Sequence, residues 1–100
     1  MTEIHPTVGL DDIVHQRTRL GALALLKTGV SLEFGAIRDA LAVTDGNLNR
    51  HLKVLSDAGY IESRRVTGNG RPRTWLTITD AGVAALNAEI AALQALIAGP

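Results

Sequence analysis

The segment from residue 44 to residue 58 carries polar side chains that could recognise a ligand with some specificity. Leu48, Leu52 and Leu55 are spaced four and three residues apart, which predicts a helix with one buried face. Asparagine and arginine lie on the other faces, and both form paired hydrogen bonds with base edges in the DNA major groove. The candidate DNA-contacting set is Thr44, Asp45, Gly46, Asn47, Asn49, Arg50, His51 and Lys53. Simple solvation of a polar face would give a similar pattern, so this helix alone leaves both interpretations open.

A second basic group surrounds a predicted β-hairpin. Residues 60–67 and 74–79 are rich in β-forming side chains, and the Asn69-Gly70 pair between them tolerates the positive φ angles of tight turns. A solvent-facing hairpin has no structural need for this many arginines. We expect it to contact the phosphate backbone or the minor groove of DNA, through Arg64, Arg65, Asn69, Arg71 and Arg73. The alternative is that these arginines aid solubility or pair with acids elsewhere.

The elements that must position these groups can be placed from caps and periodicity. A first helix should begin after Leu10 with Asp11 or Asp12 near its N-cap, and Ser31 should cap the second. The expected helices are 11–28, 32–41, 45–58 and 80–98, the last capped by Thr79. About three residues join the second and third helices, which is the spacing of a helix-turn-helix.

The predicted order is helix, helix, helix, strand, strand, helix. This describes a mainly α fold with a small β-hairpin, an α+β winged helix-turn-helix. We divide the chain into a loose N-terminal arm (1–9), a DNA-binding domain (10–79) and a C-terminal dimerisation helix (80–100), all within one structural domain.

The last helix carries apolar residues at intervals of 3, 4, 3 and 4, a heptad-like stripe flanked by small alanines. Such a stripe could pack on its own domain or against a partner helix. We favour a homodimer in which the first helix also contributes, with an interface formed by Ile13, Arg17, Leu20, Val83, Leu86, Ile90, Leu93 and Ile97.

The charge of the chain is balanced overall but segregated along the sequence. Ten basic and ten acidic residues give a net charge of zero. Residues 44–75 hold six basic and three acidic side chains, so this segment is +3 and the remainder is −3. Such segregation favours one electropositive face.

Several other classes of function find no support in the residues. The chain has no cysteine, which excludes disulfides, thiolate metal sites and cysteine nucleophiles. His5, His15 and His51 form no metal-ligand spacing, and Gly68-x-Gly70 lacks the third glycine of a dinucleotide site. We therefore expect no metal, no cofactor and no enzyme activity, and no small-molecule effector is evident.

The sequence also indicates where the protein acts. Residues 1–12 lack the apolar core of a secretory signal. The longest uninterrupted apolar run, Leu20 to Leu26, is too short to cross a bilayer. We expect a cytoplasmic protein with no membrane partner.

Two segments resemble a known family. TDGNLNRHLKVLSDAGYIES (44–63), followed by GNGRPRTWLTITDAG (68–82), resembles the winged-helix regulators of the MarR/ArsR-like group, in particular a compact subgroup. The resemblance covers about residues 8–95 and implies a recognition helix at 44–58, a DNA-touching wing at 68–73, and homodimers. Asn49 departs from the more usual serine, and Trp75 stands where tyrosine is common. The metal sensors of this group use cysteines or His/Asp sets that this chain lacks.

These observations predict a dimeric, sequence-specific regulator of transcription, a repressor, whose partner is double-stranded DNA. The main alternative is a winged helix used for protein–protein assembly, and such domains usually lose the basic wing that this chain keeps. A small enzyme is the least favoured interpretation, since no catalytic constellation can be assembled.

Overall fold

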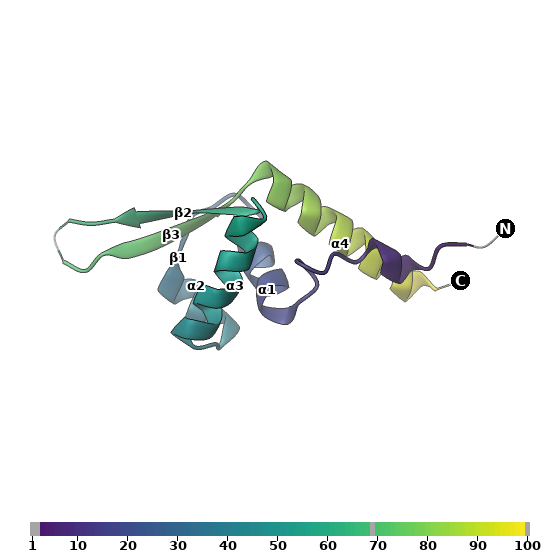
Figure 1. Cartoon of the computed structure of the whole chain (residues 1–100), viewed down its shortest axis with the longest axis horizontal. Coiled ribbons are helices and arrows are strands. Elements are labelled where there is room, and N and C mark those ends of the chain that lie inside the picture. The colour runs from purple at the N-terminus through teal and green to yellow at the C-terminus, as the bar shows by residue number, and fades with distance from the viewer. Residues whose placement is uncertain (1–2, 69, 100) are drawn as a thin grey trace.

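The computed structural model describes residues 3–68 and 70–99, so the predicted contact Asn69 lies outside the described residues. The elements are η1 (Pro6–Gly9, a 3-10 helix), α1 (Arg17–Leu26), β1 (Leu32–Glu33), α2 (Phe34–Leu41), α3 (Asp45–Asp57), β2 (Ile61–Val66), β3 (Arg73–Ile78) and α4 (Asp80–Ala98). Four α-helices thus accompany an antiparallel sheet with strand order β1-β3-β2 (Figure 1). This confirms the predicted α+β winged helix fold.

The core lies where α1, α2 and α3 meet the base of the sheet and the first half of α4. Leu48 and Leu55 are fully buried and Leu52 is nearly so, which confirms the predicted inner face of α3. Burying each such side chain stabilises the fold by about 1.5–3 kcal/mol. Leucine and isoleucine from every layer join them: Leu23, Leu26, Ile37, Ile61, Leu76 and Leu86.

The predicted start of the first helix is wrong, because α1 begins only at Arg17. The backbone N–H of Asp11 donates to Glu89 Oε1 at 3.0 Å, and Asp11 Oδ1 accepts from the N–H of Ile13 at 2.8 Å. These bonds hold the segment as a turn against α4. The N-cap is instead Gln16, whose Oε1 accepts from the backbone N–H groups of Thr18 and Arg19.

The second helix also starts later than predicted, and Ser31 is not its cap. Leu32 and Glu33 form a short strand that pairs with Leu76 and Trp75 of β3. The helix therefore begins at Phe34, with Glu33 as an N-cap that makes no side-chain capping bond. Pairing with a strand more than forty positions away overrides the local capping signal.

The caps predicted for the two later helices are confirmed. Thr44 Oγ1 accepts from the N–H of Asn47 at 3.2 Å at the start of α3. Thr79 Oγ1 accepts from the N–H of Gly82 at 3.0 Å and donates to the carbonyl of Gly59 at 2.6 Å. A Cβ at Gly82 would lie 2.1 Å from the carbonyl oxygen of Tyr60, so only glycine permits this approach of α4 to the start of β2.

The molecule is elongated, with extents of 63 × 25 × 21 Å. The β2–β3 hairpin protrudes at one end, and the second half of α4 protrudes at the other with η1 alongside (Figure 1). The N-terminal arm was predicted to be loose, but part of it is ordered against α4. Pro6–Gly9 packs on α4 so closely that a Cβ at Gly9 would lie 3.2 Å from Ala92 Cβ.

The protruding half of α4 is apolar and poorly covered. Ile97 is 85% exposed, and Leu96 is also exposed. By length and composition α4 would suffice to span a membrane, with a mean hydropathy of 1.6, although the uninterrupted apolar run had suggested no such segment. Only 17% of this apolar stretch is buried, so the helix leaves apolar surface exposed to solvent.

Candidate nucleic-acid interface

Helix α3 presents a polar strip to solvent on the side opposite its leucines. Gly46, Asn49, Arg50 and Lys53 are exposed, and Asn47 is half-buried. These five predicted residues are therefore available to a ligand.

Two others at the start of α3 are engaged within the chain. The hydroxyl of Thr44 caps the helix, and the carboxylate of Asp45 accepts from Arg38 Nη1 at 2.9 Å.

His51, which we had included in the contacting set, points inward instead. It is 8% exposed, and its Nδ1 accepts from Arg19 Nη1 at 2.9 Å. Because a guanidinium can only donate, this nitrogen must carry a lone pair and the imidazole must be neutral. Burial, followed by the charges of Arg19 and Arg50, lowers the pKa of His51. The side chain joins α3 to α1, and we leave it out of the contacting set.

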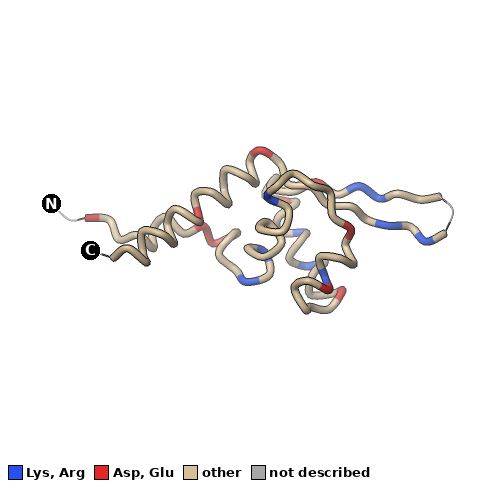
Figure 2. The backbone as a smooth tube through the Cα atoms, turned by 180° about the vertical axis from the view of Figure 1, so that it is seen from behind, with Lys and Arg blue, Asp and Glu red and all other residues tan. Residues whose placement is uncertain are grey.

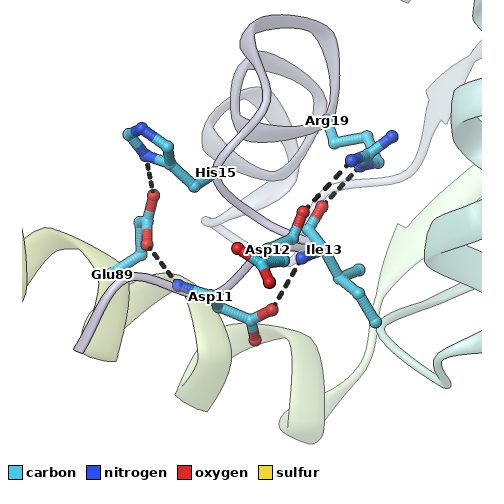
Figure 3. A network of polar contacts seen from close by, with 6 residues as sticks. All are labelled: Asp11, Asp12, Ile13, His15, Arg19 and Glu89. Atoms are coloured by element: carbon cyan, nitrogen blue, oxygen red, sulfur yellow. Dashed lines mark hydrogen bonds and ion pairs between the residues drawn. The ribbon is translucent and has the colours of Figure 1, made fainter. Parts of the chain in front are cut away.

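Arg19 is tied on its other edges as well. Its guanidinium donates to the carbonyls of Ile13 and Asp12 (Figure 3). Arg19 thereby connects the turn before α1 to α3 through His51. Nothing in the sequence pattern marked this role, since the partners lie 6, 7 and 32 positions away.

A groove of about 720 Å³ runs between α3 and the hairpin. Its charged lining contains two acids, Glu33 and Asp57, against a basic majority of Arg38, Lys53, Arg65, Arg71 and Arg73. A cleft lined mostly by one sign of charge concentrates ions of the opposite sign. The groove is thus suited to a polyanion.

Internal ion pairs offset part of that charge. Arg38 contacts Asp39 and Asp45, each at 2.9 Å, and these carboxylates raise the pKa of its guanidinium. Lys53 lies 3.0 Å from Asp57, and Arg73 lies 3.7 Å from Glu33.

The remaining two arginines of the groove, Arg65 and Arg71, form no ion pair with any residue in 3–68 or 70–99. Figure 2 shows basic segments along both strands of the hairpin and no acidic segment toward its tip. The least compensated charge of the groove therefore belongs to the hairpin.

The structure separates Arg64 from this group. Successive side chains of a strand point to opposite faces. Ser63 and Arg65 line the groove, so Arg64, opposite Trp75, lies on the other face of the hairpin. Arg38 is the basic residue of the groove that sequence reasoning missed, and its only signal was a basic position on the polar side of a helix.

The predicted interface residues of the terminal helices differ in burial. Leu86 is 2% exposed and belongs to the chain's own core. Arg17 and Ile97 are exposed, and the others are half-buried: Ile13, Leu20, Val83, Ile90 and Leu93.

Glu89 is the one charged residue between positions 81 and 98, and it is fully buried. Its carboxylate accepts from the N–H of Asp11 at 3.0 Å and lies 2.7 Å from His15 Nδ1 (Figure 3). Asp11 Oδ2 in turn accepts from the hydroxyl of Tyr60 at 3.2 Å. Burial, and then Asp11, raises the pKa of Tyr60. These contacts fix α4 to the segment before α1, and no cluster of metal-ligating side chains occurs among the described residues.

Comparison with known proteins gives a consistent result. A family model described as a winged helix DNA-binding domain matches residues 18–97. The chain is 37% identical over 70 residues to an uncharacterized protein of Methanocaldococcus jannaschii, a match that covers 70% of this chain and 76% of the other.

Two solved structures show the same fold. A transcriptional regulator homologue from Pyrococcus horikoshii superposes with a TM-score of 0.80 at 33% identity, covering 87% of this chain and 86% of that one. PadR from Bacillus subtilis, solved in complex with operator DNA, superposes with a TM-score of 0.62 at 23% identity. That match covers 74% of this chain and 46% of PadR, and at this identity it shows the fold alone.

Proposed function

The chain belongs to the winged helix DNA-binding domain family, and on that premise we propose that it regulates transcription, as a repressor, by binding double-stranded DNA as a homodimer. The observation that carries the proposal is the basic groove between α3 and the hairpin, where Arg65 and Arg71 have no acidic partner among the described residues. The likeness to a regulator homologue from Pyrococcus horikoshii supports it.

In this proposal α3 enters the major groove, whose width of about 12 Å admits a helix. Asn49 and Arg50 are exposed on its outer strip, within reach of base edges. A good paired contact discriminates between bases by about 1–3 kcal/mol. The hairpin then supplies Arg65 and Arg71 to the backbone or minor groove, where contacts position the protein.

The second protomer would pack on the exposed half of α4. Ile90, Leu93 and Ile97 follow the heptad-like spacing there and remain half-buried or exposed. Covering them with the same surface of another copy removes apolar area from water without a further partner. A bound dimer represses by occupying DNA that the transcription machinery needs, and its place of action is then the cytoplasm that contains that DNA.

Selection of bound duplexes from a random pool tests DNA binding and operator structure together. We expect a nearly palindromic sequence whose half-sites lie about one helical turn, or 10–10.5 base pairs, apart or a multiple of it. Affinity should fall linearly on a log–log plot against salt concentration, because bound phosphates release counterions.

Absence of any enrichment, together with no retention of DNA at low salt, would contradict the proposal. That result would favour the protein–protein assembly role that winged helices can also perform. Enrichment of a single, unrepeated half-site would contradict the homodimer and leave DNA binding intact.

A further inference from the structure

A second hollow, of about 500 Å³, borders α3 on the side away from the hairpin. The start of α1 contributes Gln16, Arg17 and Thr18, and the beginning of α3 contributes Asn47 and Arg50. The basic groove described above takes Asn49 and Lys53 from the other side of the same helix. Two hollows therefore flank the recognition helix, one on each side.

The second hollow is positively charged, and no acidic side chain of the described residues offsets that charge. Arg17 and Arg50 are both exposed, and neither forms an ion pair within the described part of the chain. No acidic side chain lines the hollow. His51 adds no charge of either sign to the hollow, because its imidazole is neutral while it accepts from Arg19. Two like charges that share a hollow attract an anion.

The arginine side chains, rather than the backbone N–H groups at the start of α1, would provide the contact with an anion. Gln16 Oε1 already accepts from the N–H groups of Thr18 and Arg19, each at 2.9 Å, so these backbone donors are used. The Arg17 guanidinium can bind two phosphate oxygens in parallel. The hydrogen bond of 2.9 Å between Arg19 and His51 holds α1 beside α3 and so fixes the start of α1 near Arg50.

A helix in the major groove has a phosphate backbone on each side of it. With α3 in the major groove, as proposed above, the hairpin groove would face one of these strands and the second hollow would face the other. We propose that Arg17 anchors a DNA phosphate on the side of the recognition helix opposite the wing, next to the base-reading Arg50. This inference rests on the proposed function and moves Arg17 from the predicted dimer interface to the DNA-binding surface.

The test compares Arg17→Ala with Lys27→Ala, a matched control. Lys27 carries the same charge, is exposed, lies just past the other end of α1, and lines neither hollow. Binding of a short mixed-sequence duplex is titrated at several salt concentrations for the wild type and both variants. Backbone contacts do not depend on sequence, so no operator is needed.

We expect Arg17→Ala to reduce the salt slope by about 0.9 per contact, or by about 1.8 for a dimer with two such contacts. At about 0.1 M salt this corresponds to roughly eightfold in affinity per contact. Lys27→Ala should stay close to the wild type. Arg17→Lys should restore most of the slope, because it keeps the charge although it loses the bidentate geometry.

Equal slopes for Arg17→Ala and Lys27→Ala, with a wild type that binds DNA, would overturn the inference and leave the proposed function standing. A wild type that fails to bind at low salt would overturn both. Sedimentation completes the test: if Arg17→Ala is a monomer where the wild type is a dimer, Arg17 belongs to the dimer interface and the inference is wrong.

Discussion

Both ends of the molecule protrude from the core, but they expose opposite chemistry (Figure 1). The hairpin is long, polar and basic, and Arg65 and Arg71 have no acidic partner in the described residues. The free half of α4 is apolar, with Leu96 and Ile97 in water. Neither end is needed to enclose the core, which lies between them.

The hairpin and the free half of α4 illustrate two different reasons why a protein exposes residues that are costly to leave in water. A cluster of like charges is costly in itself but binds a polyanion with release of counterions. An apolar stripe gains free energy only when another apolar surface covers it. Two copies of the basic hairpin would repel each other, whereas two copies of the α4 stripe would attract, so the ends are suited to different partners.

The largest expected effect separates the buried and the exposed parts of α4. Leu86→Asp should unfold the protein, because it places a charge in the core at a cost of several kcal/mol. Leu93→Asp should leave the fold intact and convert the proposed dimer to a monomer. Circular dichroism melts and sedimentation at tens of micromolar distinguish the two effects. A wild type that sediments as a monomer would break the comparison between the two ends.

The next effect separates base reading from backbone anchoring. Arg50→Ala should relax preference at particular base positions by about 1–3 kcal/mol, since Arg50 lies on the outer strip of α3. Arg71→Ala should weaken binding to all sequences alike. A panel of single-base operator variants measures both. If Arg71→Ala reshapes the profile at several positions while Arg50→Ala leaves it unchanged, the two roles are reversed.

A smaller effect distinguishes two arginines of the same hairpin. Arg73 lies 3.7 Å from Glu33, whereas Arg71 has no acidic partner among the described residues. Arg71→Ala should reduce the salt slope by about one unit per wing contact. Arg73→Ala should reduce it less, and Glu33→Gln should raise the affinity for DNA. Equal slopes for the two arginine variants would show that the pair with Glu33 is broken on binding.

The smallest effect concerns pH and the link between α1 and α3. The pKa of His51 is lowered in the folded state, so the unfolded chain takes up a proton first as the pH falls. The contribution of neutral His51 to the stability of the fold is complete above about pH 6.5. It is lost progressively as the pH falls from there to the lowered pKa of His51.

His51→Gln is the control for this effect, since its amide oxygen can accept from Arg19 and does not titrate. Urea denaturation of both proteins between neutral and mildly acidic pH isolates His51, because every other histidine is common to both. A difference in stability between the two proteins that stays constant with pH would contradict the prediction.

Local signals were enough to identify α3 and the hairpin, the two elements proposed to contact DNA. The leucine stripe and Thr44 identified α3, and the change of period identified the hairpin. The start of α1 was missed because it depends on Glu89, 78 positions from Asp11. Strand β1 was missed because two residues acquire their conformation only by pairing with β3.

The candidate site shows the same division. Exposed positions of α3 followed from helical spacing, but the burial of His51 depends on Arg19 in another helix. The separation of Arg64 from Arg65 was within reach, because strand alternation alone places neighbours on opposite faces. The hollow beside Arg17 was not, since it exists only once α1 and α3 are packed.

Only Thr79 separates the last residue of β3 from the first residue of α4. Its hydroxyl caps α4 and also donates to the carbonyl of Gly59, so the joint is fixed to the turn that follows α3. Strand β3 of the wing and the proposed dimer helix α4 are thus joined rigidly, with a fixed orientation to each other. Since each helical residue turns the chain by about 100°, a single inserted residue would redirect the partner copy. In the proposed dimer, the length of this joint would therefore set the distance between the two DNA half-sites.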